Sequence, residues 1–394
     1  MERFITTRFY IMGCLLIMNF HAPASALAVT IEQQDAANRF LLELIEERKT
    51  PGLQYLFVDS DKVLFQFYGG FADLKQKLPV RESTTFNGYS ITKTFTAAAV
   101  VKLAQEGKID LDAPISRYLS DFPYQKSPTI RQTLQHTAGF PNPNPLAWVH
   151  RVEEHAKFDE QAFIHKVIHE NSRLDFDPGE KFSYSNIGYL LLGEVIHKVS
   201  GKPYHEYVLS EIVNPLSLSK DNHIAYTIDD PANHARGYIR RWNWLNLLLG
   251  WFIDRDKYLG PAVDGWVPFN HILINGNAYG GLVGNAGGFA VYLQAMLAAK
   301  EPFNSEMLSL LWTTGSTNDG EPIRTGLAWV HGTLNGQSYF AHSGGGGGYY
   351  CEIRIYPDAN RASVIMTNNT EISGQRYLDR IDRFFLTGLD NHGG

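Results

Sequence analysis

The feature that most constrains the fold is the order of strand and helix patterns along the 394-residue chain. Short apolar runs typical of strands lie near both ends, at 53–59 and 62–68 and again at 326–334, 337–342, 349–356 and 362–367. Helical patterns at 31–49 and 374–387 flank them, and residues 111–299 are mainly helix and loop. Because a sheet must be covered by other elements, this order predicts an α/β (α+β) fold. We expect one antiparallel sheet built from both chain ends, flanked by helices, with an inserted helical lobe at about 111–299.

The first 28 residues have the pattern of an export signal. Arg3 and Arg8 precede a mostly apolar stretch, and small residues then recur at alternate positions. We expect export to the periplasm or the medium, with cleavage near Ala26 or Ala28, which would leave 29–394 as a single domain. An uncleaved amino-terminal anchor and a lipid anchor on Cys14 are the lesser alternatives.

The charge and the cysteine content exclude some partners and some sources of stability. The net charge is −6 with no basic run, which argues against nucleic acid as a partner. Residues 1–28 carry two basic side chains and one acidic side chain, so the mature chain would carry −7. Cleavage would also leave Cys351 as the sole cysteine, so the core and not a disulfide must supply stability.

Ser90-Ile91-Thr92-Lys93 is the first candidate for chemistry. A serine hydroxyl needs a base to become a nucleophile, and residues three apart on a helix lie side by side. The alanine-rich run that continues to Gly107 favours a helix here, so Lys93 can serve as that base. Taken alone, the motif is explained more simply by a buried helix with a serine cap.

Two further motifs have residues suited to substrate binding. In Tyr184-Ser185-Asn186, the tyrosine can act as a general acid or base and the asparagine can donate to a carbonyl. A capping serine beside a buried tyrosine is the alternative. His342-Ser343-Gly344 ends a predicted strand, and Gly344–Gly348 lets a ligand approach backbone N–H groups closely. A flexible hairpin is the alternative there.

In order and spacing, the three motifs resemble the S-x-x-K, Y-x-N and [K/H]-[S/T]-G elements of penicillin-recognising serine hydrolases. The chain is most similar to the class C β-lactamase-related group, which includes penicillin-binding proteins, D,D-carboxypeptidases, D-aminopeptidases and family VIII carboxylesterases. The resemblance covers about residues 35–385. It implies a β-lactamase/transpeptidase-like fold and a serine hydrolase domain at 29–394.

The resemblance also implies the role of each site residue. Ser90 would be acylated, Lys93 would take its proton, and Tyr184 would share the proton relay. Asn186 and His342 would bind substrate beside Gly344, and the N–H groups of Ser90 and Gly345 would form the oxyanion hole. Neither a metal ion nor an organic cofactor is implied.

His342 stands where the lactamases have lysine. Histidine is largely neutral at pH 7, which disfavours recognition of a substrate carboxylate. We therefore expect an exported hydrolase of a small-molecule ester, amide or D-amino-acid peptide of the peptidoglycan type. D,D-carboxypeptidase activity, β-lactamase activity and a non-catalytic cell-wall-binding role are the alternatives.

Three other features receive weaker interpretations. His165 and His169 are four apart, but their helix is polar and no H-E-x-x-H motif occurs, so we interpret them as a solvated face without metal. His136 matches a family position near the cleft and is assigned to packing. The apolar segment from Trp242 to Ile253 is too short to span a bilayer. It can form a wall of the acyl pocket, a buried helix or a weak membrane-surface contact.

Overall fold

The computed structural model describes residues 29–243, 246, 249–370 and 377–386. Its centre is a seven-stranded sheet with the strand order β11-β12-β13-β14-β1-β2-β3, and every neighbouring pair is antiparallel. The strands are β1 (Gly52–Val58), β2 (Val63–Asp73), β3 (Leu78–Pro79), β11 (Val330–Leu334), β12 (Gln337–Gly346), β13 (Tyr349–Tyr356) and β14 (Arg361–Thr367). The two ends of the chain meet where β14 pairs with β1, so the predicted sheet is confirmed.

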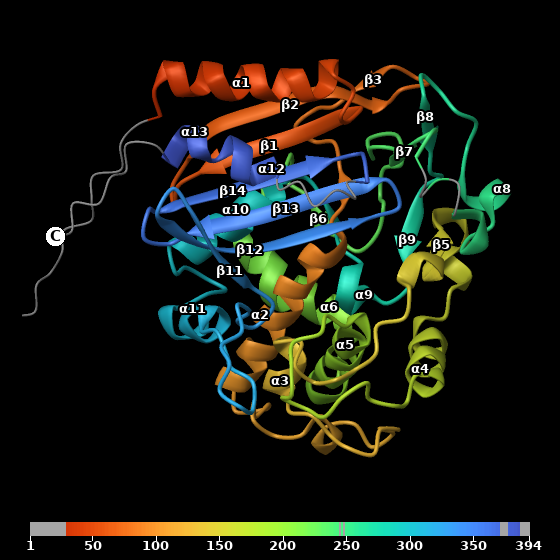
Figure 1. Cartoon of the computed structure of the whole chain (residues 1–394), viewed down its shortest axis with the longest axis vertical. Helices are drawn as coiled ribbons and strands as arrows, with labels where there is room; N and C mark the ends of the chain where they lie inside the picture. Colours follow the sequence, from red (N-terminus) through yellow and green to blue (C-terminus); the bar gives the residue numbers. More distant parts are fainter. Residues whose placement is uncertain (1–28, 244–245, 247–248, 371–376, 387–394) are drawn as a thin grey trace, which may run out of the picture.

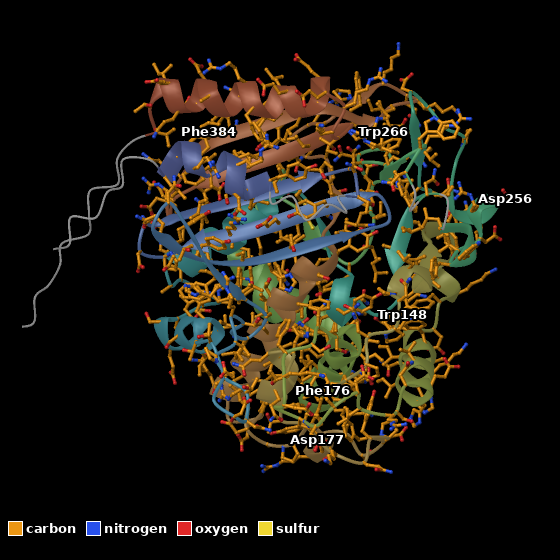
Figure 2. The ribbon with its side chains drawn as sticks, in the orientation of Figure 1. Trp148, Phe176, Asp177, Asp256, Trp266 and Phe384 are labelled. Atoms are coloured by element: carbon orange, nitrogen blue, oxygen red, sulfur yellow. The ribbon has the colours of Figure 1, made fainter. Side chains whose placement is uncertain are left out.

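Alternate residues of β1 bury the two faces of this sheet in different cores. Leu53, Tyr55 and Phe57 pack on one side, and Leu56 and Val58 on the other, as the two-residue period of a strand requires. The first face is covered by α1 (Ile31–Glu46), α12 (Tyr377–Ile381) and α13 (Arg383–Leu386), as Figure 1 shows. Phe384 of α13, labelled in Figure 2, contacts Phe40 of α1.

The second face carries α10 (Ala286–Leu297), which packs on β1 and β14. By sequence this helix falls within the lobe predicted at 111–299, but in space it belongs to the sheet layer. The reason is that α10 is apolar on most sides, with a core-facing surface that the sheet buries. The helix α10 is therefore not part of the inserted lobe, contrary to the prediction.

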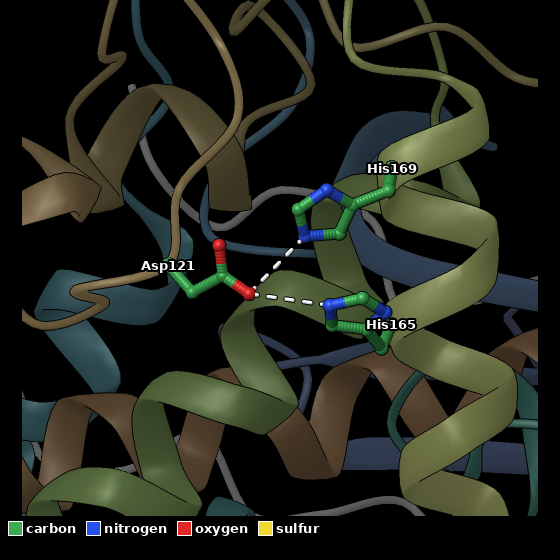
Figure 3. Close-up of side chains that lie close together, drawn as sticks. All are labelled: Asp121, His165 and His169. Carbon is green, nitrogen blue, oxygen red and sulfur yellow. Dashed lines mark hydrogen bonds and ion pairs between the residues drawn. The ribbon is translucent and has the colours of Figure 1, made fainter.

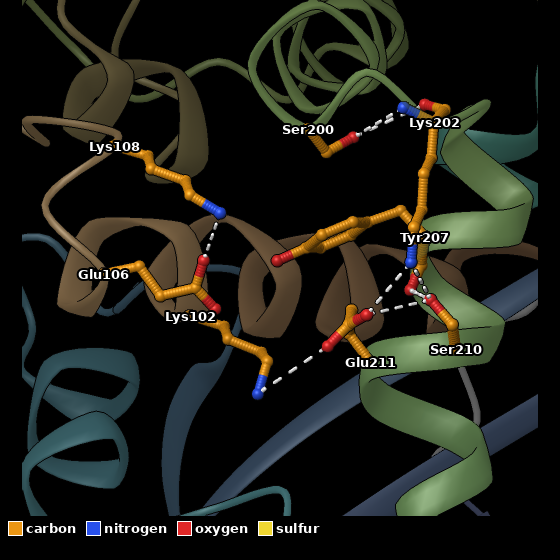
Figure 4. Close-up of polar contacts among 8 residues, drawn as sticks. All are labelled: Lys102, Glu106, Lys108, Ser200, Lys202, Tyr207, Ser210 and Glu211. Carbon is orange, nitrogen blue, oxygen red and sulfur yellow. Dashed lines mark hydrogen bonds and ion pairs between the residues drawn. The ribbon is translucent and has the colours of Figure 1, made fainter.

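Below the sheet, the lobe packs around α2, as the lower half of Figure 1 shows. Its main helices are α2 (Thr92–Gln105), α3 (Ile130–Leu134), α4 (Glu160–Glu170), α5 (Asn186–Ser200), α6 (Tyr204–Val208), α9 (Asn277–Gly280) and α11 (Ser305–Trp312). Nearly every residue of α2 is buried, so this helix is the axis shared by the sheet and the lobe. At its outer end, Glu211 pairs with Lys102 and Lys202, at 4.0 and 3.2 Å (Figure 4). Such exposed pairs contribute little to stability.

Short strands form a third region beside the sheet and the lobe. They are β4 (Phe86–Asn87), β5 (Val149–Arg151), β6 (Ile224–Ala225), β7 (Tyr238–Arg240), β8 (Trp266–Pro268), β9 (Ile272–Ile274) and β10 (Val283–Gly284). They pair as β5-β9, β7-β8 and β4-β10-β6, and α8 (Arg255–Tyr258) lies next to them. Trp266, Trp148 and Asp256 mark this region in Figure 2.

The predicted export signal at 1–28, Cys14 included, lies outside the described residues, as do residues 374–376 and 387 of the predicted helix at 374–387. Among the helices that the structure describes, none combines the length and the apolar character needed to cross a membrane.

Candidate active site

Ser90 lies at the point where a short strand turns into the central helix. β4 ends at Asn87, a 3₁₀ turn covers Tyr89–Ile91, and α2 begins at Thr92. Tyr89 has a φ of +44°, a conformation that non-glycine residues adopt only where their surroundings enforce it. This turn places Ser90 at the positive end of the α2 dipole, as the motif predicted.

Lys93 is fully buried one turn further along, beside the serine. Its Nζ lies 3.1 Å from Ser90 Oγ, 2.9 Å from Asn186 Oδ1 and 2.7 Å from the carbonyl oxygen of Tyr279. Burial lowers the pKa of Lys93 well below its usual value, because the ammonium form loses its hydration. The two carbonyl oxygens can only accept hydrogen bonds, so they take the two protons of a neutral amine. The lone pair of that amine then faces Ser90.

Tyr184 approaches the same hydroxyl from the other side. Its phenol oxygen lies 2.8 Å from Ser90 Oγ. Burial raises the pKa of Tyr184 well above its usual value, so the phenol keeps its proton at neutral pH and donates it to the serine oxygen. Ser90 is thus held between the Lys93 amine, whose pKa is lowered, and the Tyr184 phenol, whose pKa is raised.

The Tyr184-Ser185-Asn186 motif forms the start of α5 and serves two purposes. Ser185 caps the helix by accepting from the N–H of Gly188, which is the structural alternative predicted for it. Asn186 turns its Oδ1 to Lys93, so the NH₂ end of its amide faces away from the lysine. The sequence predicted a contact of Asn186 with substrate, but not this hydrogen bond to the base.

His136 supports Tyr184 from behind. Its ring lies 4.4 Å from the Tyr184 ring, and its Nδ1 accepts from the backbone N–H of Ser185 at 3.1 Å. Burial, with the nearby Lys93, lowers the pKa of His136 well below its usual value, so the ring is neutral. These contacts agree with the packing role predicted for this residue.

His342 lies on β12 and is also buried and neutral. Its Nδ1 donates to the Ser343 carbonyl at 2.8 Å, which leaves Nε2 as an acceptor. Burial, with the nearby Lys93, lowers the pKa of His342 to about 3. A ring in this state can accept a hydrogen bond but offers no positive charge to a carboxylate. His342 therefore stays neutral to a lower pH than an ordinary histidine, which strengthens the expectation made from the sequence.

The predicted end of the strand at His342–Gly344 is wrong, because β12 continues to Gly346. Gly344, Gly345 and Gly346 pair with Cys351, Tyr350 and Tyr349 of β13. A Cβ on Gly344 would lie 2.4 Å from the carbonyl oxygen of Gly88 and 2.8 Å from the Ser90 nitrogen. Glycine is therefore required here for β12 to pass against the nucleophile turn.

The glycine part of β12 presents an open edge toward Ser90. β11 pairs with β12 only from Gln337 to Ala341, so β11 does not cover the backbone at Gly344–Gly346. Ser90 and Gly345 line the same cavity. Cys351 is buried, and its Sγ donates to the carbonyl oxygen of Gly88 at 2.9 Å, so it packs beneath the turn that carries Ser90. An oxyanion site between Ser90 and Gly345 is compatible with this arrangement.

Beside Ser90 lies a cavity of about 230 Å³ with mainly apolar walls. Ser90, Tyr184, Asn186 and Gly345 stand at one part of its lining. The other part is built from Leu146, Val149, Ile239, Leu249, Ile253, Phe269, Ile272 and Ile274. Leu249 and Ile253 come from the apolar segment singled out in the sequence. That segment therefore contributes a wall of the cavity next to the nucleophile.

The same segment has an outer side that is open to solvent. Trp242 and Trp251 are 85% and 82% exposed, and Phe252 is also exposed. Of its described residues, Leu249–Trp251 form a 3₁₀ turn. The interpretation as a buried helix fails for these residues, because so much of their aromatic surface is outside the core.

A second cavity of about 380 Å³ also borders Tyr184 and has mixed walls, in which polar side chains lie beside Phe182, Val330 and Ala341. His136, His342, Thr325, Tyr350 and Glu352 contribute to it. Glu352 is buried and paired with Arg354 at 2.6 Å, while the Tyr350 hydroxyl donates to it. Tyr184 thus lines both the apolar cavity and this more polar one, called the polar cavity below.

Two contributors to this site lie outside the sequence motifs. The carbonyl of Tyr279, in α9, accepts from Lys93, and the side chain of Asn142 accepts from the N–H of Asn186 at 3.1 Å. Residue type does not indicate which backbone carbonyl will accept a hydrogen bond from Lys93. Asn142 lies in a loop rich in proline and asparagine, where its own role is not evident from sequence. Only the packing of α9 and of this loop against α2 and α5 reveals their roles.

Comparison with known proteins agrees with this geometry. The chain is similar to Penicillin-binding protein 4* of Bacillus subtilis (strain 168), with 24% identity over 336 residues, covering 84% of this chain and 71% of that protein. It shares its fold with the D-amino acid amidase of Ochrobactrum anthropi SV3, with a TM-score of 0.73, 19% identity and coverage of 91% and 100%. EstCE1, described as a hydrolase with promiscuous acyltransferase activity, gives a TM-score of 0.70 at 20% identity, with coverage of 90% and 100%.

The family model described as Beta-lactamase matches residues 32–384, which is most of the chain. The match includes Ser90, Lys93, Tyr184, Asn186 and the glycine edge of β12. With the fold and the mutual contacts of these residues, it follows that this chain belongs to the Beta-lactamase family and is a serine hydrolase.

Proposed function

We propose that this protein hydrolyses carboxylic esters with an apolar acyl group, through an acyl-enzyme on Ser90. The observation that carries the proposal is that the Ser90 hydroxyl, bonded to Lys93 and Tyr184, opens into a cavity with mainly apolar walls. Small amides and D-amino-acid peptides share the same bond chemistry and form the wider substrate class. Two proteins that share the fold are a D-amino acid amidase and EstCE1, a hydrolase with promiscuous acyltransferase activity, so the fold is known to support chemistry of this kind.

The acylation step follows from the positions of the two proton carriers. Neutral Lys93 takes the proton of Ser90 as its oxygen attacks the substrate carbonyl carbon. The carbonyl oxygen becomes an oxyanion, which the N–H groups of Ser90 and Gly345 receive. Tyr184 gives its proton to the leaving group as the C–O bond breaks, and the proton held by Lys93 replaces it. A water molecule then repeats the sequence on the acyl-enzyme and restores Ser90.

The difference in polarity between the two cavities indicates which cavity receives the acyl group and which receives the leaving group. The acyl group belongs in the apolar cavity, because that cavity contains both Ser90 and Gly345. The leaving group then lies toward Tyr184 and the polar cavity, where His342 Nε2 can accept a hydrogen bond. A carboxylate there would meet a lone pair and not a cation. For this reason we place β-lactams and D-Ala-D-Ala peptides behind neutral esters as substrates.

We further propose export of the protein through residues 1–28, with weak contact to a lipid surface through Trp242 and Trp251. The two exposed indoles support that contact, since tryptophan favours the boundary between lipid and water. N-terminal sequencing of the exported protein should begin near residue 27 or 29. Recovery of the intact amino terminus inside the cell would refute the export signal.

A labelling and substrate panel tests the hydrolase proposal. Wild type should react with a fluorophosphonate probe, and Ser90→Ala should not. Ser116→Ala, which changes an exposed serine outside the cleft, is the matched control and should label like wild type. The panel comprises p-nitrophenyl esters from acetate to laurate, nitrocefin and a D-Ala-D-Ala peptide. Folded wild-type protein that fails to label, or that cleaves only the peptide or nitrocefin, would overturn the ester assignment. A non-catalytic, cell-wall-binding protein would neither label nor turn over any of them.

A further inference from the structure

Outside the catalytic centre, three metal-binding side chains converge on the surface of the lobe, as Figure 3 shows. His165 and His169 stand one turn apart on α4, and their rings stack with centroids 4.1 Å apart. Asp121 comes from the loop before α3. Its Oδ2 lies 3.3 Å from His165 Nε2 and 3.2 Å from His169 Nε2. From sequence, two histidines on a polar helix predict a solvated face; the loop adds a third donor.

The spacing of the donor atoms suits a small divalent cation. In a tetrahedral zinc site with bonds of ~2.0–2.1 Å, neighbouring donor atoms are ~3.3 Å apart. Both distances from Asp121 to the histidines equal this edge, and the donor atoms of all three residues lie within 4.8 Å of one another. Two imidazole nitrogens with one carboxylate oxygen form a donor set that Zn²⁺ accepts readily.

The surroundings hold the three residues in place. They line a surface hollow of about 210 Å³ whose floor includes Leu119, Ile164, Ile168 and Leu191. These apolar contacts fix the loop against α4 and α5, so the ligands are positioned before a metal arrives. Without a metal, the same atoms form exposed ion pairs, which add little to stability. The stability of the fold therefore does not explain why these three side chains converge.

We propose that Asp121, His165 and His169 bind one Zn²⁺ ion, with solvent completing its coordination. The ion would tie the loop that carries Asp121 to α4. The site does not share any residue with the Ser90 centre, and its existence does not depend on the proposed hydrolase activity.

Isothermal titration of the tag-free, chelator-treated protein with ZnCl₂ tests the site. We expect saturable binding of one ion per chain, and no comparable binding of Mg²⁺, which prefers oxygen ligands. Asp121→Asn, His165→Ala and His169→Ala should each weaken the affinity at least ~10-fold. Asp121→Asn retains the shape of the side chain, and all three positions are exposed, so folding is preserved. His197→Ala, at a partly exposed histidine on α5, is the matched control and should bind like wild type.

Two further readouts separate a built site from scattered surface binding. Co²⁺ should give the intense visible absorption of a low-symmetry tetrahedral site in wild type, which Asp121→Asn should lose. Zn²⁺ should raise the melting temperature of wild type and of His197→Ala but not of the ligand variants. Binding that is weak and multiple, or equal in wild type and all ligand variants, would overturn the proposal and leave the cluster as ion pairs.

Discussion

The two cavities that meet at Tyr184 differ in the kind of substrate group that they can bind. The one that contains Ser90 is lined by aliphatic and aromatic side chains, while the other is lined by His136, His342 and Glu352. The first can select a substrate by the length of its apolar chain, and the second by hydrogen bonds and charge. In the proposed mechanism, Ser90, Lys93 and Tyr184 act in the same way on every acyl substrate. Substitutions should therefore act uniformly at the centre and selectively in each cavity.

The largest effect is expected at the centre. Lys93→Ala removes the base and should lower kcat by about 10²–10⁴ for every substrate, whatever its acyl length or leaving group. Lys102→Ala, at a partly exposed lysine of the same helix, is the control and should leave kcat unchanged. Steady-state kinetics with two esters and one amide measure this. A loss confined to one cavity's substrates would contradict a shared base.

The pH profile examines the same lysine without a substitution. Because burial lowers the pKa of Lys93, its neutral form exists at a lower pH than that of an exposed lysine. The kcat/KM of a neutral ester should rise about ten-fold per pH unit below that pKa. It should level off well before ~10.4, the pKa of an ordinary lysine. A profile still rising at the ordinary lysine pKa would show that the pKa of the base is not lowered.

Tyr184→Phe tests whether the phenol between the two cavities protonates the leaving group. The variant keeps the ring against His136 but loses the proton donor, so kcat should fall by about 10² for alkyl esters, whose alkoxide must be protonated. p-Nitrophenyl esters should lose much less, because p-nitrophenolate leaves without a proton. Equal losses for both substrates would assign Tyr184 to positioning and not to acid catalysis.

His342→Lys probes the polar cavity. The new cation should raise kcat/KM for a substrate with a carboxylate on its leaving group about ten-fold relative to the matching neutral methyl ester. His342→Gln, which is polar and uncharged, should leave this ratio near that of wild type. If both variants shift the ratio equally, charge at this position is not what sets the preference.

The smallest effect is expected in the apolar cavity. Leu249→Ala should lower kcat/KM for a long-chain ester by about ten-fold at most and leave acetate esters unchanged. The loss of one apolar contact with the chain costs about 1 kcal/mol, which corresponds to about five-fold in kcat/KM. Trp251→Ala, at an exposed position in the same segment, is the control and should leave both esters unchanged in solution. An unchanged chain-length preference in Leu249→Ala would place the acyl group elsewhere.

Local patterns were sufficient for most of the secondary structure. The periods of the apolar residues located strands β13 and β14 and the helix that carries Lys93 to within a few residues. The predictions were wrong where contacts with other elements determine the extent or the position of an element. β12 extends through three glycines because β13 pairs with them, and α10 joins the sheet because β1 and β14 bury it.

The sequence by itself determined the sheet made from both chain ends, the three motifs and, through them, the resemblance to a hydrolase family. These depend on residue type and on short spacings, which a helix or strand period converts directly into geometry. The tertiary structure alone decided the surroundings. Burial of Lys93, the carbonyl of Tyr279, the cavity wall at Leu249 and the meeting of Asp121 with His165 all join residues far apart in the chain. A charge or a cavity depends on everything packed around it, and no local pattern encodes that.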